Sequence, residues 1–201
     1  MRRRALLAAS GILVAPMAGC LGTIDGTGSA CEPPESSEPT NEPGTGFPSI
    51  ELLADESDRD HIAVATSILR HFDATGPARI EIVVQNTSDD RQQFTFLDWP
   101  PFPADTGFHS DGETGLFLAP EDGYQVNVPD EPADGCWHIA DPPATSDVLT
   151  TVELDPCETI SETYGLYHVT GDTCLKAGEY RFSVADVGAQ GNEWGFTVLL
   201  E

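Results

Sequence analysis

The chain has 201 residues, and its 34 acidic side chains against 9 basic ones give a formal net charge of −25. This balance excludes binding to the phosphate backbone of nucleic acids, which requires clustered Lys and Arg, and it disfavours attraction to an anionic membrane surface. With 39% hydrophobic residues, the composition indicates a folded domain rather than an intrinsically disordered chain.

Residues 1–20 have the pattern of an export signal with a lipidation site. An apolar run follows three arginines and is shorter than the roughly 20 residues that span a bilayer, as in a signal peptide. Arg3-Arg4-Ala5-Leu6-Leu7 fits the twin-arginine export pattern. Met17-Ala18-Gly19-Cys20 resembles a lipobox, whose cysteine receives the lipid and becomes the new N-terminus. We expect lipidation at Cys20; the alternative is an ordinary signal peptide with a chance cysteine.

Residues 21–47 are rich in Gly, Pro, Ser, Thr and Glu. A segment of this composition buries too little apolar surface to offset the entropy lost on ordering, so we expect a disordered, flexible tether. Such a tether would lift residues 48–201 away from the membrane. The order of signal, cysteine and tether predicts a lipoprotein anchored at the extracellular face of the cell membrane.

Residues 48–201 contain short runs in which β-branched and aromatic residues alternate with polar or small ones. A period of two indicates half-buried strands, and turn residues separate the runs. In the first run a helix is the alternative, because Ala and Leu are frequent there, but β-branched residues dominate. About seven to nine strands predict an all-β fold, an immunoglobulin-like β-sandwich or else a barrel. The predicted strands cover residues 62–68, 80–84, 94–96, 116–119, 124–128, 148–154, 160–169, 180–184 and 194–200.

Between two predicted strands, residues 99–113 form a long segment rich in Pro and Gly. Long loops in a compact sandwich often carry function, so this segment is the candidate contact loop. Its candidate contact residues are Trp99, Phe102, Phe108 and His109. The alternative is that Trp99 and Phe102 plug one end of the hydrophobic core.

If Cys20 carries a lipid, four of the five cysteines remain, and outside the cell an even number favours disulfides. The four are Cys31, Cys136, Cys157 and Cys174, which allow three pairings. Loop entropy does not choose among the pairings, because the alternative loops differ by less than about 1 kcal/mol in the stabilisation that their closure supplies.

Two cysteines and two histidines offer a metal site as the alternative to disulfides. They are Cys136, His138, His168 and Cys174. Thiolate and imidazole ligands suit zinc or copper, but the spacing matches no common site. His61, His71 and His109 have no neighbours at ligand spacing. We therefore expect neither a bound metal nor a cofactor.

The chain lacks the short motifs of common catalytic sites. It contains no G-x-S-x-G, no H-E-x-x-H, no C-x-x-C and no phosphate-binding loop. Carboxylates are so numerous that their pairing singles out no general acid and base. We therefore expect a protein that is not an enzyme.

Four short motifs in the predicted domain form a set. Two of them are Pro77-Ala78-Arg79-Ile80 and, after it, Asn86-Thr87-Ser88. The others are Leu154-Asp155-Pro156-Cys157-Glu158 and Leu175-Lys176-Ala177-Gly178-Glu179-Tyr180. The set resembles a strand and the repeated Leu-x-Pro-Gly turns of intracellular-proteinase-inhibitor-type domains. Here Cys157 replaces the glycine of one turn, and Ala177 replaces the proline of the other.

Trp99-Pro100-Pro101-Phe102 and Trp194-Gly195-Phe196 are similar to segments of haloarchaeal lipoproteins with such a domain. The resemblance covers about residues 60–201. It implies an immunoglobulin-like sandwich, and protease inhibition as an alternative function. It also implies a disulfide between Cys136 and Cys174, which leaves Cys31 to pair with Cys157.

The near-absence of lysine beside abundant Asp and Glu resembles proteins of halophilic archaea. At about 1 M salt the Debye length is roughly 3 Å, which screens most of the self-repulsion of an acidic domain. Without residues 1–20, which hold three arginines and no acidic residue, the net charge becomes −28.

These observations together predict a non-catalytic, lipid-anchored, extracellular binding or structural module of a halophilic archaeon. Its expected partners are the membrane, through the lipid, and an unidentified protein. The alternatives are an inhibitor of a secreted protease and a metal-binding protein that uses Cys and His ligands.

Overall fold

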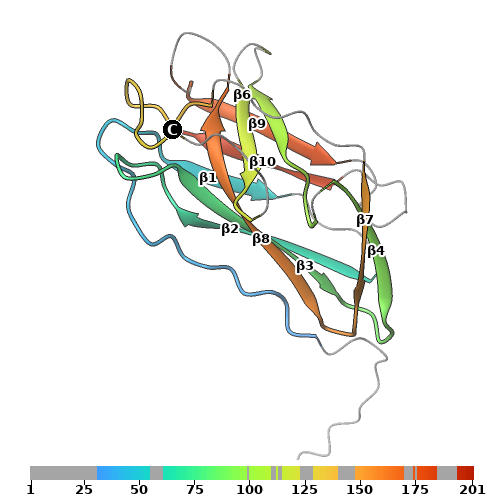
Figure 1. The fold of residues 1–201 in the computed structure, drawn as a ribbon. Helices are drawn as coiled ribbons and strands as arrows, with labels where there is room; N and C mark the ends of the chain where they lie inside the picture. The colour runs from blue at the N-terminus through green and yellow to red at the C-terminus, as the bar shows by residue number, and fades with distance from the viewer. Residues whose placement is uncertain are drawn as a thin grey trace, which may run out of the picture.

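The computed structural model describes residues 31–54, 61–98, 100–109, 112, 115–122, 129–139, 148–169, 174, 176–184 and 194–201. These residues form ten strands and no helix, so the all-β prediction is confirmed (Figure 1). In this part of the chain there is consequently no helix that could cross a membrane. The strands are β1 (Ile50–Ala54), β2 (Ile62–Arg70), β3 (Ala78–Asn86), β4 (Gln92–Leu97), β5 (Asp105–His109), β6 (Gly115–Pro120), β7 (Leu149–Leu154), β8 (Thr159–His168), β9 (Gly178–Val184) and β10 (Trp194–Leu200).

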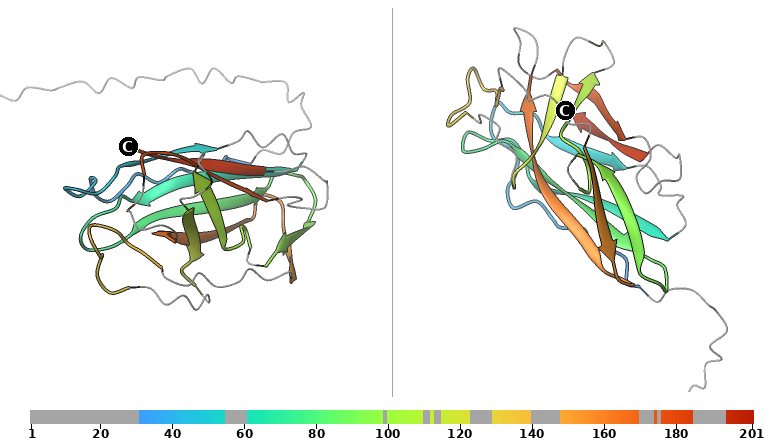
Figure 2. Two further views of the ribbon diagram at one scale, coloured as in Figure 1. Left: turned by 90° about the horizontal axis from the view of Figure 1, so that it is seen from above. Right: turned by 45° about the vertical axis from the view of Figure 1, so that its right-hand side comes forward.

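Eight of the strands form one antiparallel sheet in the order β1-β10-β9-β5-β6-β8-β3-β2. Its two outer strands, β1 and β2, also contact each other, so the sheet wraps around the core and is nearly closed. Strands β4 and β7 pair separately and form a two-stranded ribbon at one side of the molecule (Figures 1 and 2).

The alternation in the sequence becomes the two faces of each strand. In β3, Ile80, Ile82 and Val84 are at most 1% exposed, whereas Glu81 and Val83 between them are half-buried. The register places Ile80 and Val84 opposite Ile68 and Val64 of β2, so both strands turn the same apolar face inward. This pairing makes residues 62–70 a strand and excludes the helical alternative.

Each predicted strand within the described residues is present, and the run at 124–128 lies outside them. Strands β1 and β5 are additions that the alternation did not predict. Strand β1 pairs with β10 at the end of the sheet, and β5 joins β6 to β9 within it. The described strands therefore number ten, against about seven to nine expected.

The largest fully buried side chains of the core are aromatic. Burying one such side chain contributes about 1.5–3 kcal/mol relative to leaving it in water. The largest fully buried ones are Tyr164, Tyr180, Phe72, Phe96, Phe102, Phe117, Phe182 and Phe196.

Residues 31–47 lie along the domain, where the sequence predicted part of a flexible tether. We call them the strap; they form the blue segment along the lower left of Figure 1. The amide of Thr40 donates to the carbonyl of Leu69 at 2.9 Å, and that of Gly44 donates to the carbonyl of Phe72 at 2.8 Å. The folded part therefore begins at residue 31 instead of residue 48, and residues 21–30 lie outside the described residues.

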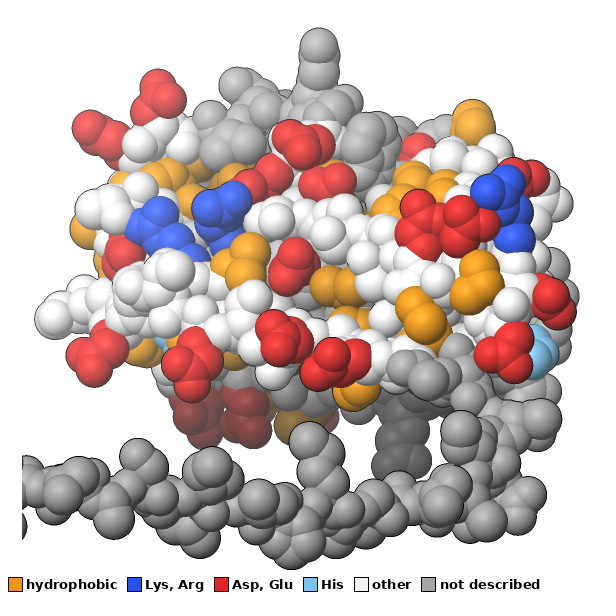
Figure 3. Space-filling model, turned by 90° about the horizontal axis from the view of Figure 1, so that it is seen from below, with side chains coloured by type: hydrophobic (Ala, Val, Ile, Leu, Met, Phe, Trp, Pro, Cys, Tyr) orange, Lys and Arg blue, Asp and Glu red, His pale blue; other side chains and the backbone are white. Residues whose placement is uncertain are grey.

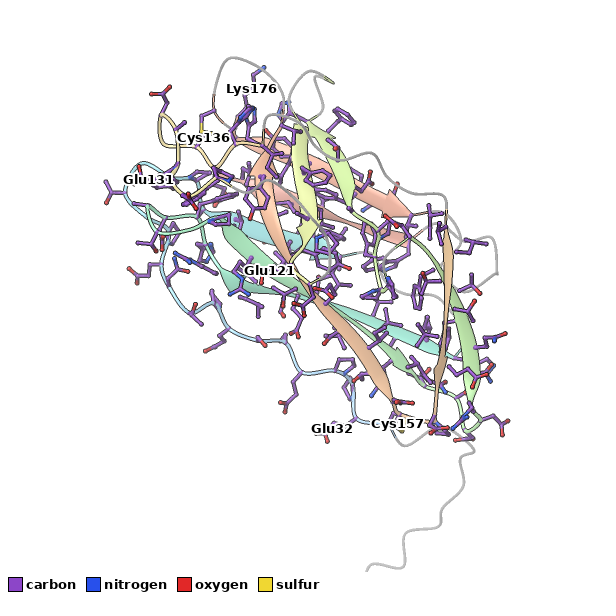
Figure 4. All side chains as sticks on the ribbon, in the orientation of Figure 1. Glu32, Glu121, Glu131, Cys136, Cys157 and Lys176 are labelled. Atoms are coloured by element: carbon purple, nitrogen blue, oxygen red, sulfur yellow. A yellow bond between two sulfur atoms is a disulfide. The ribbon has the colours of Figure 1, made fainter. Side chains whose placement is uncertain are left out.

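Two disulfides join distant parts of the chain. Cys31 pairs with Cys157 across a Cα–Cα distance of 5.2 Å, and Cys136 pairs with Cys174 across 5.6 Å. These are the pairs that the resemblance implied. They lie at opposite ends of the domain, as the labels of Cys157 and Cys136 in Figure 4 show.

Candidate contact surface

The segment predicted as a contact loop is divided by a strand. Strand β5 occupies five of its positions, and Trp99 lies outside the described residues. Phe102 is fully buried, Phe108 is 53% exposed, and His109 is half-buried. The structure therefore does not bring the predicted contact residues to one surface.

Phe102 belongs to the core, so its prediction as a contact residue is wrong. Its ring packs edge-on against Trp194, with centroids 5.8 Å apart, and against Phe196 at 5.5 Å. Its backbone is held by the hydroxyl of Tyr164, which donates to the Phe102 carbonyl at 2.7 Å and accepts from the Phe102 amide at 3.1 Å. Of the alternative, in which Trp99 and Phe102 plug the core, the burial of Phe102 in the core is confirmed, and Trp99 lies outside the described residues.

Burial keeps the Tyr164 hydroxyl, which holds the backbone of Phe102, in its protonated form. Tyr164 is fully buried, and this loss of solvent raises the pKa of its phenol well above the usual range. The hydroxyl therefore keeps its proton and can donate and accept at once. A buried polar group satisfied in both directions holds the Phe102 backbone in a single position.

Phe108 reaches the surface because of the register of β5. Gly107 is buried beneath it, and a Cβ atom at that position would lie 2.8 Å from the ring of Phe182. Successive side chains of a strand point to opposite faces, so the inward Gly107 turns Phe108 outward. Phe108 pairs with Arg181 of β9.

His109 ends β5 and lies against β9. Its ring is tilted over Tyr180, with centroids 5.4 Å apart, and it also fills the space in which a side chain at Gly178 would stand. The Tyr180 hydroxyl donates to the carbonyl of Lys176 at 3.0 Å. We call Phe108 and His109 the β5 surface. Lys176 lies at the end of the domain opposite Cys157 (Figure 4).

A second apolar group lies on the two-stranded ribbon, and the sequence did not single it out. Leu97 at the end of β4 pairs with Leu149 at the start of β7. Leu97, Val148 and Leu149 are 36%, 62% and 66% exposed. The run at 148–154 predicted a strand correctly, but alternation alone does not tell which face a neighbouring layer covers.

The cysteines of the alternative metal site are joined in the Cys136–Cys174 disulfide and so offer no thiolate ligand. The rings of His138 and His168 do come together, with centroids 5.4 Å apart, because their segments form a parallel bridge. Across the described residues, no group of three or more His, Cys, Asp or Glu side chains is arranged to hold a metal.

The remaining histidines lie in separate places. His71 accepts a hydrogen bond at Nδ1 from the amide of Ile50 at 3.4 Å, and burial lowers its pKa. His61 precedes β2 with a φ of 74°, a left-handed turn conformation. Neither residue adjoins the β5 surface in sheet order, since β1 and β2 lie at the ends of the sheet.

One polar concavity lies where β3, β8 and the end of β6 meet. It has a volume of about 360 Å³ and is lined by Arg79, Glu121, Asp122, Ser161, Glu162 and Thr163. Arg79 forms an ion pair with Glu121, so the guanidinium already has an anionic partner. Burial and the nearby Glu121 raise the pKa of Tyr167 to about 12, so this phenol is not a general base near neutral pH.

Comparison of the chain with family models, with curated proteins and with solved structures finds no match. The resemblance to intracellular-proteinase-inhibitor-type domains accordingly remains a hypothesis based on short motifs.

Proposed function

We propose that the protein is a non-catalytic, lipid-anchored binding or structural module at the extracellular face of the membrane of a halophilic archaeon. The observation that carries this proposal is the pairing of the cysteines. Four of the five cysteines pair with one another, which leaves Cys20 as the fifth, at the end of the lipobox-like motif. Stable disulfides are typical of oxidising compartments outside the cytoplasm.

The surface charge supports a high-salt environment. On the face shown in Figure 3, acidic side chains are scattered over the described surface, and basic ones are few. Arg70, Arg79 and Arg91 are each paired with a carboxylate, so they neutralise little beyond their immediate neighbours. These surface carboxylates repel one another at low ionic strength, and molar salt screens the repulsion.

The β5 surface is the proposed place of contact with a protein partner. Among the described residues, Phe108 is the only Phe, Tyr or Trp residue whose side chain is exposed. Aromatic side chains contribute much of the binding energy of many protein interfaces. Phe108 is held by a strand in the middle of the sheet, which presents the ring on a rigid support. Inhibition of a protease has less support, because Phe102 is unavailable to enter a cleft.

Replacement of Cys20 tests the anchor. In a halophilic host, the wild-type protein should sediment with membranes, and Cys20→Ser should release most of it into the medium because the lipid is lost. The double variant Cys31→Ser/Cys157→Ser is the matched control and should stay with the membranes, since it keeps Cys20. Membrane retention of Cys20→Ser would contradict the anchor.

A further inference from the structure

The strap is tied to the domain at its start, by the disulfide of Cys31 and a hydrogen bond from Gln85 Nε2 to the Glu32 carbonyl at 3.1 Å, and again at Asn41. Its first residue, Cys31, is bonded to Cys157 in the turn between β7 and β8. Further on, the Asn41 amide nitrogen donates to the His71 carbonyl at 3.2 Å and to the Asp73 carboxylate at 2.8 Å, and the Asn41 oxygen accepts from the His71 amide at 2.8 Å. The tie at Cys31 is a reversible covalent bond, and the tie at Asn41 is a hydrogen-bonded clamp.

Between Cys31 and Asn41, the exposure and composition of the strap favour its detachment from the domain once the disulfide is open. Residues 35–40 are exposed, and residues 32–39 include three prolines and three glutamates. Prolines cannot donate the backbone hydrogen bonds that would add the strap to the sheet as a further strand. The glutamates lie on a molecule with a large net negative charge, which repels them. The covalent tie at Cys31 therefore contributes much of what keeps this part of the strap in place.

The two disulfides differ in their accessibility to a thiol. Cys157 is exposed in its turn and Cys31 is half-buried, whereas Cys136 is 6% exposed and Cys174 is half-buried. Thiol–disulfide exchange begins with attack of a thiolate on one sulfur, so accessible disulfides exchange more readily than covered ones. A reductant should open Cys31–Cys157 before Cys136–Cys174.

We propose that Cys31–Cys157 is a redox latch that sets how far the domain can stand from its anchor. A dithiol supplies two electrons and two protons and becomes a cyclic disulfide. The bond between the two cysteines breaks, and each cysteine leaves as a thiol. A hydrogen bond from Gln85 Nε2 to the Glu32 carbonyl, 3.1 Å long, still holds the start of the strap after reduction. Once this bond also breaks, the strap detaches as far as Thr40, where its next hydrogen bonds to the sheet lie.

The change in reach follows from chain geometry and rests on the proposed lipid at Cys20. With the latch closed, the ten residues 21–30 separate the anchor from the domain, and they can span at most about 35 Å. With it open, residues 21–39 separate them, and the limit rises to about 65 Å. Reduction would therefore nearly double the distance over which the β5 surface can meet a partner.

Limited proteolysis of the full exported chain in molar salt tests the latch. A glutamate-specific protease should cut the Glu35–Ser36 bond slowly in the oxidised protein, because cleavage requires a detached segment; Glu38 is followed by Pro39, and that bond resists the protease. Mild dithiol treatment, or the double variant Cys31→Ser/Cys157→Ser, should accelerate the cut after Glu35 at least about tenfold. Cys136→Ser/Cys174→Ser is the matched control and should leave the rate in the strap unchanged.

The latch is refuted if the strap is cut equally fast with the Cys31–Cys157 bond closed and open. It is also refuted if the control variant is cut as fast as the latch variant, because general destabilisation would then explain both. If the latch variant does not fold, partial reduction of the wild-type protein, with thiols located by mass, gives the same comparison. None of these readouts requires the lipid, so a failure of the Cys20 experiment would remove the change in reach but not the opening of the strap on reduction.

Discussion

Phe102 and Phe108 belong to the same short segment, yet one is in the core and the other in solvent. Both are phenylalanines beside Pro and Gly, so local composition gives them the same appearance. The distinction comes from residues far along the chain: Tyr164, Trp194 and Phe196 enclose Phe102. At the scale of single residues, the sequence predicted candidates and the tertiary contacts separated them.

The two phenylalanines form a matched pair of variants. Phe102→Ala should lower the free energy of unfolding by about 3–5 kcal/mol, because it leaves a cavity against two aromatic rings. Phe108→Ala should change it by less than about 0.5 kcal/mol, because the ring already faces solvent. Thermal unfolding followed by circular dichroism in high salt measures both. Equal losses in the two variants would contradict the assignment of Phe108 to the surface.

At position 157, the local turn geometry favours glycine, but the disulfide to a distant cysteine requires Cys157. Its φ is 63°, in the left-handed region where glycine is favoured, and the turn pairs the Glu158 amide with the Asp155 carbonyl at 3.0 Å. Pro156 precedes it, as in a type II turn. Cysteine departs here from the glycine of the resembling motif, and the structure supplies the reason: its sulfur is bonded to Cys31.

At the scale of elements, alternation succeeded wherever a strand has one covered face. Runs such as 80–84 and 194–200 were predicted because their buried residues recur at every second position. Strand β5 was not predicted, because Asp105, Thr106 and Gly107 show no alternation of apolar residues. Its inward-facing residue is Gly107, which leaves room for the ring of Phe182. The docking of the strap was not predicted, because it depends on hydrogen bonds and a disulfide, which cannot be inferred from amino-acid composition.

The turn between β2 and β3 joins the strap to the sheet through Asp73. The titration of this carboxyl group makes the stability of the folded protein depend on pH. Burial raises the pKa of Asp73, but hydrogen bonds from Thr75 and Arg70 outweigh it and lower the pKa from 3.8 to about 2. A lowered pKa means that the folded state favours the carboxylate. The stabilisation is therefore complete above about pH 4 and is lost as the pH falls through about 2.

Asp73→Asn tests this contribution. The variant should melt at a lower temperature than the wild type at pH 5, because the charge that pairs with Arg70 is gone. The difference should shrink as the pH falls below about 4 and vanish below about pH 2, where the wild-type carboxylate becomes protonated. A difference in melting temperature that stays constant from pH 5 to pH 2 would contradict the role of the carboxylate.

For the whole molecule, the net charge of −25 predicts stability that depends on salt. Between about 0.1 M and 1 M salt the Debye length falls from roughly 10 Å to 3 Å, which removes most of the repulsion among surface carboxylates. The melting temperature should rise by about 10 °C over this range, which for a chain of this size corresponds to about 3 kcal/mol.

Differential scanning calorimetry of the oxidised protein at several KCl concentrations measures this dependence. A variant in which exposed Glu35, Glu38 and Glu51 are replaced by Gln should have a smaller slope, since fewer carboxylates repel one another. A melting temperature independent of salt would show that the surface carboxylates do not oppose folding at low ionic strength.

The sequence by itself determined the all-β class, most of the strands and the acidic character, because alternation and composition are local or additive properties. It also predicted the lipid anchor, which awaits the Cys20 experiment. Only the tertiary structure decided that Phe102 is core, that the strap is docked, and that the sheet nearly closes between β1 and β2. Each of these depends on contacts between residues far apart in the chain, which no local pattern encodes.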